Sequence, residues 1–363
     1  MPTTRVIDGF AISVEKNPVP QTPEEVFTTI KTFGKQWTPH MFMVDWEAGK
    51  GWHDARIVPY QNLSIPPTAP CLHYGQEGFE GMKATRTRDG RIALFDPKAN
   101  AERFMKTAKE VDMEPVPVDL FIAGLKALLL QERDYIPNDG NLYIRPTEVG
   151  MSPFWGAEDT NHCLFYIIVT PAANSSPEPF DALVESIHSR AGPGGTGSAK
   201  VGGNYSRLTA DKKRAREQFG CADVLYTAAD NKELIEEFTV RNFFVEFTEG
   251  VVLTPELRDR ILPGTTRNKI LQLVREKDEK GEKAYEGSYT IEKLRQDLAK
   301  GVVKSVFSCG TSVGVQPIGN LVLNTGERIP MPEGTLPKKL FDYFNGLRDG
   351  TVEDTHGWMV FLD

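Results

Sequence analysis

Apolar positions along the chain follow two different periods, and the alternation of these periods predicts a mixed α and β protein. In the first half, apolar side chains recur at helical spacing around Asn100–Lys109 and again over residues 118–134. Short apolar runs at Asn141–Pro146 and Cys163–Val169 have the length of strands, and the second is nearly continuous, as in a buried strand. These patterns predict an α/β or α+β fold with at least one mainly antiparallel sheet.

The second half repeats this alternation. One helix is expected from about Tyr205 to Phe219, ended by Gly220, and another starts near Thr265, where apolar residues repeat at i, i+3 and i+4. A third helix, IEKLRQDLAKG, leads into the strand VVKSVF and the turn Ser308–Ser312. Four further strand patterns are DVLYT, LIEEFTV, NFFVEF and VVLTP.

Between the halves, Thr170–Pro179 (TPAANSSPEP) combines three prolines with small polar residues and is expected to be a linker. We therefore expect a small N-terminal domain over residues 1–169, a linker over 170–179 and a large domain over 180–363. Ligand sites tend to form where two domains meet.

Composition argues against several classes of protein. The chain has 363 residues, 40% of them hydrophobic and 25% charged, and its net charge of −8 argues against nucleic acid or an anionic membrane as a partner. No apolar run in the sequence approaches the ~20 residues of a membrane span, and the N-terminal segment lacks the apolar core of a signal peptide. Four scattered cysteines and six histidines without ligand spacing predict reduced thiols, no metal site and a cytoplasmic location.

Lys200 stands in the stretch RAGPGGTGSAKVGGNY, in which six of the sixteen residues are glycine. Such a lysine is either one more surface residue or an amine that forms a Schiff base with a carbonyl compound. The second role requires room for the side chain to move, and the flanking glycines would supply it.

Two other patterns have both a structural and a functional explanation. The Gly-Thr-Thr helix start near Thr265 would either cap its own backbone or cradle a phosphate, and the turn Ser308–Ser312 has the same character. Glu236 and Glu237 are adjacent on a strand, so they either protect an edge strand together or place one carboxylate inward against a protonated ring nitrogen. An aldehyde, a phosphate and a basic ring nitrogen together suggest pyridoxal 5′-phosphate.

The chain as a whole resembles the branched-chain aminotransferases, members of the class IV group of pyridoxal-phosphate enzymes. The resemblance runs through the motifs GWHDARIVPY, LHYGQEGFEGMKA, LFDPKANAERF, LYIRPT, SAKVGGNY, LTPELRDRILPGTTR, GTS and HGWM. It implies a two-domain enzyme of fold type IV, similar to D-amino acid aminotransferase, with pyridoxal 5′-phosphate as cofactor. It also implies a homodimer in which Tyr74 reaches the site of the neighbouring subunit.

The resemblance assigns roles to individual residues. Lys200 matches the lysine that binds the cofactor aldehyde and then moves the substrate proton as general acid and base. Tyr205 matches the partner of the phenolic oxygen, and Glu237 matches the partner of the pyridine nitrogen, which makes Glu236 the outward residue. Arg103 matches the arginine that binds the cofactor phosphate. The other residues that the resemblance assigns to cofactor binding are Thr265, Thr266 and Thr311. The substrate-binding residues are Tyr74, Phe79, Tyr143, Arg145, Thr311 and Ser312.

Three features depart from the family pattern. After Glu237 the family commonly has a glycine two residues on, then Thr-Met or Gly-Met and then Asn, whereas this chain has Thr239, Val240 and Arg241 in those places. The linker reads PAANSS, with Asn174, and lacks the tyrosine usual after PAGA. The segment VGVQP after GTS lacks the CxxC pair of some animal members. These changes leave the cofactor site intact and bear on the substrate preference.

We therefore expect a transaminase that moves an amino group between Leu, Ile or Val and 2-oxoglutarate, with small amino acids and 2-oxo acids as its partners. The altered strand and linker motivate an alternative, a specialised class IV aminotransferase or lyase with another amino donor. A third reading is a non-catalytic metabolite-binding protein on the same scaffold, and the intact Lys200, Tyr205, Glu237 and Arg103 argue against it.

Overall fold

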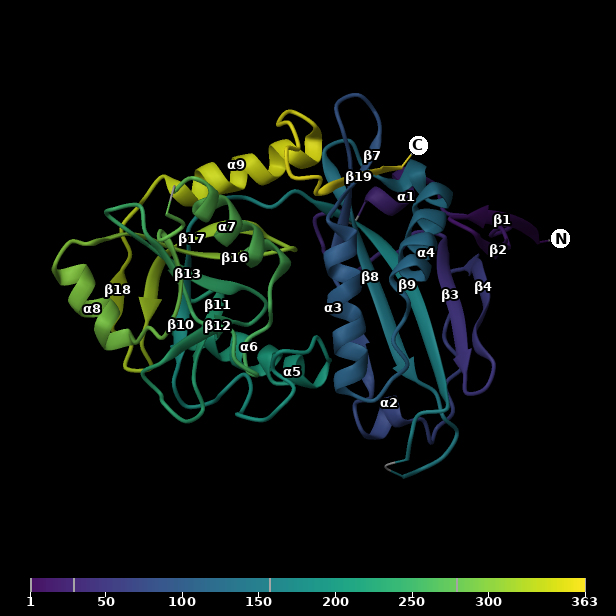
Figure 1. Cartoon of the computed structure of the whole chain (residues 1–363), viewed down its shortest axis with the longest axis horizontal. Helices are drawn as coiled ribbons and strands as arrows, with labels where there is room; N and C mark the ends of the chain where they lie inside the picture. Colours follow the sequence, from purple (N-terminus) through teal and green to yellow (C-terminus); the bar gives the residue numbers. More distant parts are fainter. Residues whose placement is uncertain (1, 29, 157, 279, 363) are drawn as a thin grey trace. The chain divides into compact units, whose positions relative to one another are not determined.

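The chain divides into two compact units in the computed structural model, which describes residues 2–28, 30–156, 158–278 and 280–362 (Figure 1). The first unit consists of Met1–Asn174, Lys200–Gly202 and Asn345–Asp363, and the second of Ser175–Ala199 and Gly203–Phe344. The segments Lys200–Gly202 and Asn345–Asp363 thus belong to the first unit although they come after Asn174. A single division point along the sequence therefore does not separate the two units. None of the helices within the described ranges has the length and apolarity that a bilayer crossing requires.

The sheet of the first unit contains β1 (Thr3–Ile7), β2 (Phe10–Val14), β3 (His40–Glu47), β4 (Gly51–Pro59), β5 (Glu77–Phe79), β6 (Met82–Arg86), β7 (Ile92–Phe95), β8 (Gly140–Gly150), β9 (His162–Ala173) and β19 (Met359–Leu362). Its order is β1-β2-β4-β3-β9-β8-β6-β7-β19, with β5 paired to β8. β2 and β4 are parallel, and the other named pairs are antiparallel. β9 ends at Ala173, beyond the Val169 expected, because residues 170–173 pair with residues 140–143 of β8.

The helical elements of the first unit are α1 (Pro23–Phe27), α2 (Pro70–His73), α3 (Pro97–Glu110), α4 (Val118–Gln131) and the 3-10 turn η1 (Arg133–Tyr135). α3 and α4 lie side by side against the sheet and bury their apolar faces there (Figure 1). The rings of Phe104, Phe121 and Phe165 meet with centroids 5.4 to 5.6 Å apart. Each such buried ring stabilises the fold by ~1.5–3 kcal/mol. Gly124 is required for close packing, because a Cβ there would lie 2.5 Å from the ring of Phe42.

The sheet of the second unit contains β10 (Phe180–Glu185), β11 (Asp223–Thr227), β12 (Ile235–Phe238), β13 (Asn242–Phe247), β14 (Val252–Thr254), β15 (Ala284–Glu286), β16 (Val303–Gly310), β17 (Gly314–Val322) and β18 (Arg328–Pro330). Its order is β12-β11-β10-β17-β16-β13-β14-β15, and β18 pairs with β17. β12 also pairs with β13 through Glu237 and Asn242, so the path from β12 to β13 forms a closed barrel. The acidic pair therefore lies on a strand with neighbours on both sides, which removes the edge-strand explanation.

The helices of the second unit are α5 (Gly203–Ser206), α6 (Leu208–Phe219), α7 (Thr265–Glu276) and α8 (Ile291–Ala299), and α9 (Leu336–Asp349) precedes the C-terminal segment. The single helix expected from Tyr205 is thus divided into a short α5 and a longer α6. α6 ends where expected, because Gly220 adopts a left-handed conformation with φ of +67° and its N–H donates to the carbonyls of Ala215 and Arg216. The start of α7 at Thr265 is also confirmed.

One carboxyl group in the first unit is buried without a counter-charge. Glu148 on β8 is fully buried, and its two oxygens have no hydrogen-bond partner of normal geometry among the described residues. Burial raises the pKa of Glu148 well above its ordinary value, and the nearby thiol of Cys163, a weak donor, opposes this only in part. Burial therefore favours the neutral, protonated form of Glu148 in the folded protein.

This burial predicts a specific dependence of stability on pH. A carboxyl whose pKa is raised in the folded state makes its most favourable contribution below the unfolded pKa of about 4.3. Above that value stability falls by up to about 1.4 kcal/mol per pH unit, and the loss levels off once the pH passes the folded-state pKa. Glu148→Gln removes the titration, so the wild-type protein should lose stability relative to the variant as pH rises from 5 to 8. Urea unfolding of both proteins across this range measures the difference, and parallel profiles would contradict the prediction.

Candidate active site

The main chain around Lys200 is held by three hydrogen bonds within the first unit. The Lys200 N–H donates to the hydroxyl of Thr107 on α3 at 3.0 Å, and the Lys200 carbonyl accepts from the N–H of Phe79 at 3.0 Å. Two residues later, the N–H of Gly202 donates to the carboxylate of Glu77. A Cβ on Gly202 would overlap that carboxylate, so glycine is needed for this approach. The backbone at Lys200 is therefore anchored, although the surrounding sequence is rich in glycine.

The side chain of Lys200 lies among three residues expected to bind substrate. Its Nζ lies 4.9 Å from the ring centroid of Phe79, within the range of a cation–π contact. The guanidinium carbon of Arg145 lies 4.7 Å from the same centroid, and Arg145 donates to the Tyr143 hydroxyl at 3.3 Å. Gly81 allows the Tyr143 hydroxyl to approach, since a Cβ there would overlap it. The structure thus brings Lys200, Phe79, Tyr143 and Arg145 together in the first unit.

Arg103 on α3 forms a buried ion pair with Glu80. Its Nε lies 2.7 Å and its Nη2 2.9 Å from the two carboxylate oxygens, and Asn100 donates to the same carboxylate at 2.7 Å. Burial alone would raise the pKa of Glu80, but Arg103, together with Lys200 and Asn100, outweighs it and holds the pKa below its ordinary value. The pair fixes the orientation of the guanidinium, because two parallel hydrogen bonds allow only one geometry.

In the second unit, the buried Glu237 carboxylate is held by one ion pair and two hydrogen bonds. Arg190 Nη1 lies 2.9 Å from Glu237 Oε1, the N–H of Leu262 donates to the same oxygen at 2.8 Å, and the Asn242 side chain donates to the other at 3.4 Å. The guanidinium of Arg190 also lies over the ring of Tyr205, 5.5 Å from its centroid. Arg190 therefore connects Glu237 with Tyr205, the two residues expected at the cofactor ring.

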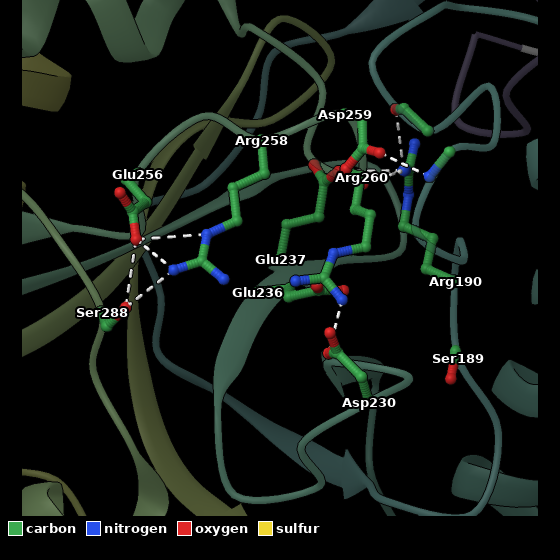
Figure 2. Close-up of polar contacts among 12 residues, drawn as sticks. Ser189, Arg190, Asp230, Glu236, Glu237, Glu256, Arg258, Asp259, Arg260 and Ser288 are labelled. Carbon is green, nitrogen blue, oxygen red and sulfur yellow. Dashed lines mark hydrogen bonds and ion pairs between the residues drawn. The ribbon is translucent and has the colours of Figure 1, made fainter.

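Glu236 was expected to face outward, and this expectation is wrong. Its side chain is only 3% exposed, because β12 lies within the closed barrel path. Glu236 pairs instead with the buried Arg260, whose Nε lies 3.0 Å from its carboxylate and whose Nη1 lies 2.6 Å from Asp230 (Figure 2). Burial raises the pKa of Glu236 to about 7, with Arg260 opposing the shift and Glu237 adding to it.

The two candidate phosphate-binding turns of the second unit are differently built. Thr265 and Thr266 are buried at the start of α7, and the residue that precedes the helix, Gly264, contributes no side-chain cap. Their N–H groups therefore lie at an uncapped helix start, where anions bind. Thr311 and Ser312 are half-buried in the turn that joins β16 and β17.

Arg241, one of the three residues that depart from the family pattern after Glu237, has polar and aromatic partners within the second unit. Its Nε lies 3.5 Å from Asp223, its Nη1 donates to Gln316 at 2.7 Å, and its guanidinium lies 4.5 Å from the ring centroid of Phe180. Burial lowers the pKa of Arg241, and Asp223 opposes that shift. Its charge is thus compensated by neighbouring strands.

A further group of titratable residues in the second unit, Glu185, His188 and Asp211, presents ligand atoms within 4.8 Å of one another. Arg214 pairs with Glu185, and the Tyr226 hydroxyl donates to Asp211 at 3.0 Å. With these partners, Glu185, His188 and Asp211 form a network of ion pairs and hydrogen bonds.

Sequence reasoning missed Thr107, Glu77, Arg190 and Arg260, which hold the predicted residues. Arg190 begins the glycine-rich stretch, and Glu77 and Arg260 lie within the motifs LHYGQEGFEGMKA and LTPELRDRILPGTTR, so these three carried a signal by their position. Tyr74, by contrast, is 60% exposed beside His73, with ring centroids 6.3 Å apart.

Comparison with known proteins tests the resemblance. The family model described as amino-transferase class IV matches residues 78–321. The chain belongs to the class IV aminotransferases.

Curated relatives are similar to this chain over nearly its whole length. The branched-chain-amino-acid aminotransferase of Mycolicibacterium smegmatis is 33% identical and covers 98% of both chains. The probable branched-chain-amino-acid aminotransferase of Staphylococcus aureus strain N315 is 37% identical over 91% of this chain and 93% of its own. The expected membership of the branched-chain aminotransferase group is therefore confirmed.

Solved structures of class IV relatives have the same fold. The branched-chain aminotransferase of Escherichia coli matches with a TM-score of 0.66 at 23% identity, covering 89% of this chain and 99% of its own. The branched-chain amino acid aminotransferase of Thermobaculum terrenum, solved in its PLP-form, matches with a TM-score of 0.71 at 19% identity, covering 89% and 98%. The expected two-domain fold of type IV is confirmed.

The buried ion pair on α3 predicts a loss of stability when one partner is removed. Glu80→Gln leaves the Arg103 charge buried without its counter-charge, so the free energy of unfolding should fall by about 3 kcal/mol. Urea unfolding at pH 7 measures this change. Glu102→Gln on the same helix is the matched control, because Glu102 is 53% exposed and its ion pair with Lys98 is long, at 3.9 Å. This substitution should change the free energy of unfolding little. Equal effects of the two substitutions would contradict the prediction.

Proposed function

We propose that this protein is a pyridoxal-phosphate-dependent transaminase that moves the amino group between the branched-chain L-amino acids Leu, Ile and Val and 2-oxoglutarate. The observation that carries the proposal is the similarity, over nearly the full chain, to relatives named branched-chain-amino-acid aminotransferases. Lys200 supplies the primary amine that this chemistry requires.

The residues of the second unit fit the ring of pyridoxal 5′-phosphate. Glu237 is a buried carboxylate, and a buried carboxylate suits a protonated ring nitrogen. The Tyr205 hydroxyl would bind the phenolic oxygen.

The phosphate of the cofactor would bind at the uncapped start of α7, through Thr265 and Thr266, together with Thr311 and Arg103. Glu80 fixes the orientation of the Arg103 guanidinium through its Nε and Nη2.

When bound, the cofactor supplies an aldehyde for the amino group and a ring that withdraws electrons from the substrate α-carbon. Lys200 would hold the cofactor. After the substrate amine replaces it, Nζ would accept the proton of the substrate α-carbon as general base and would then donate it, as general acid, to the carbon of the former aldehyde. Phe79, Tyr143 and Arg145, which gather around Lys200, would line the substrate side. The backbone at Thr311 and Ser312 would bind the substrate carboxylate.

The same proposal includes a cytoplasmic homodimer in which the exposed Tyr74 contributes to the site of the neighbouring subunit. It also retains a small domain over residues 1–169, a linker over 170–179 and a large domain over 180–363. The four cysteines are free thiols, which supports a reducing location.

The proposal predicts a visible change in the purified protein when L-leucine is added without an amino acceptor. The wild-type protein should show a yellow cofactor band that leucine converts to the pyridoxamine form. Lys200→Ala should abolish the yellow band and lower turnover by at least about a thousandfold. Lys338→Ala, at an exposed lysine paired with Asp342, should leave both unchanged.

A yellow band that leucine leaves unaltered, but that another amino donor converts, would replace this proposal with a specialised class IV enzyme. The missing linker tyrosine near Asn174 motivates that second candidate. Absence of the band in wild-type protein supplied with pyridoxal phosphate would overturn the transaminase proposal itself.

A further inference from the structure

Arg190 is a buried cation placed between two groups of the candidate site. It lies in the loop that follows β10, and its side chain is 1% exposed. Its Nη1 lies 2.9 Å from the Glu237 carboxylate and also donates to the carbonyls of Gly197 and Arg260, at 3.3 and 3.4 Å. These main-chain acceptors hold the guanidinium in one orientation.

The other neighbour of this guanidinium is Tyr205. Arg190 lies over the Tyr205 ring at 5.5 Å from its centroid. Burial would lower the pKa of Arg190, but the charge of Glu237, followed by the charge and hydrogen bond of Tyr205, raises it. Arg190 is therefore coupled to both residues and stays charged.

A second arginine, Arg260, pairs with Glu236, so Glu236 does not compete with Glu237 for the charge of Arg190. Glu236 is compensated by Arg260, which also pairs with Asp230 (Figure 2). Arg260 meets Arg190 through its main-chain carbonyl. The two adjacent glutamates therefore have separate cations, and the charge of Arg190 acts mainly on Glu237 and Tyr205.

We propose that Arg190 is a positioning residue of the transaminase site, which keeps Glu237 ionised and oriented and strengthens hydrogen-bond donation by Tyr205. This inference rests on the proposed function, in which Glu237 binds the ring nitrogen and Tyr205 binds the phenolic oxygen of the cofactor. A cation beside a phenol makes its O–H a stronger donor, and a cation beside a carboxylate makes it harder to protonate. One side chain thus sets the protonation of the cofactor at two positions of its ring.

The experiment is a pH titration of the visible cofactor band in the holoenzyme. Arg190→Met removes a positive charge from the candidate site. Loss of this charge should stabilise the protonated form of the bound cofactor and so raise the pKa at which its visible band titrates. The midpoint of the titration should rise by about one pH unit, since the charge of Arg190 acts on Glu237 and Tyr205, the two residues proposed to bind the cofactor ring. Retention of pyridoxal phosphate on dilution should weaken about tenfold.

Two further variants separate positioning from folding. Arg190→Lys keeps a charge near Glu237 but lacks the planar fork, so its midpoint should lie between those of the wild type and Arg190→Met. Arg258→Gln is the matched control from the loop that also carries Arg260, because Arg258 pairs with Glu256 and Ser288 and should leave the midpoint unchanged. Thermal unfolding of each apoprotein identifies a variant that merely fails to fold.

The coupling to Tyr205 is tested in a double-mutant cycle. If Arg190 acts partly through the phenol, its substitution should shift the midpoint less in a Tyr205→Phe background. If Arg190→Met does not fold, Arg190→Lys and the same cycle decide the question.

A wild-type cofactor band with an unshifted midpoint in the folded Arg190 variants overturns the inference and leaves the transaminase proposal standing. Shifts of equal size with and without the Tyr205 hydroxyl overturn the proposed role of Arg190 at Tyr205. A wild-type protein that forms no band with added pyridoxal phosphate overturns the proposed function, and with it the basis of this inference.

Discussion

Burial of charge is the constraint on which the candidate site depends, since an ion removed from water must find a counter-charge or change its protonation. Both units use the same solution. Glu80 faces Arg103 in the first unit, and Glu237 faces Arg190 in the second, with each partner buried. The charged groups are thus fixed before any ligand binds, so binding does not have to order them, which is the arrangement that favours electrostatic catalysis.

Anchoring of the main chain complements this arrangement at Lys200. Its backbone bonds to Thr107 and Phe79 leave the long side chain as the part that can move. The glycines nearby allow close approach of main chain to Glu77. The two roles proposed for the Lys200 amine would be served by this division, because the reach of the amine is set by the side chain alone.

Local patterns in the sequence were sufficient to predict several helices and strands and some of the residues that the structure brings together around Lys200 and Glu237. The helical period located α3, α4 and α7, and Gly220 gave the end of α6. The partners of these residues were beyond local reasoning, because they depend on contacts far apart in sequence. Lys200 bonds to a residue 93 positions away, and Gly202 to one 125 positions away.

The error at Glu236 has the same origin. Alternation along a strand correctly separates the faces of Glu236 and Glu237, but it places one face in solvent only if the sheet is open. Closure of the path from β12 to β13 is a property of the whole unit, and so is the arginine that compensates Glu236.

The route of the chain also limits how this protein could be divided or recombined. The polypeptide passes from one unit to the other after Asn174, Ala199, Gly202 and Phe344. A fragment of residues 1–174 would lack both the edge strand β19, which pairs with β7, and the tripeptide that contains Lys200. Neither unit is therefore an independent module, and a gene fusion or domain exchange that preserved the site would have to transfer the entire chain.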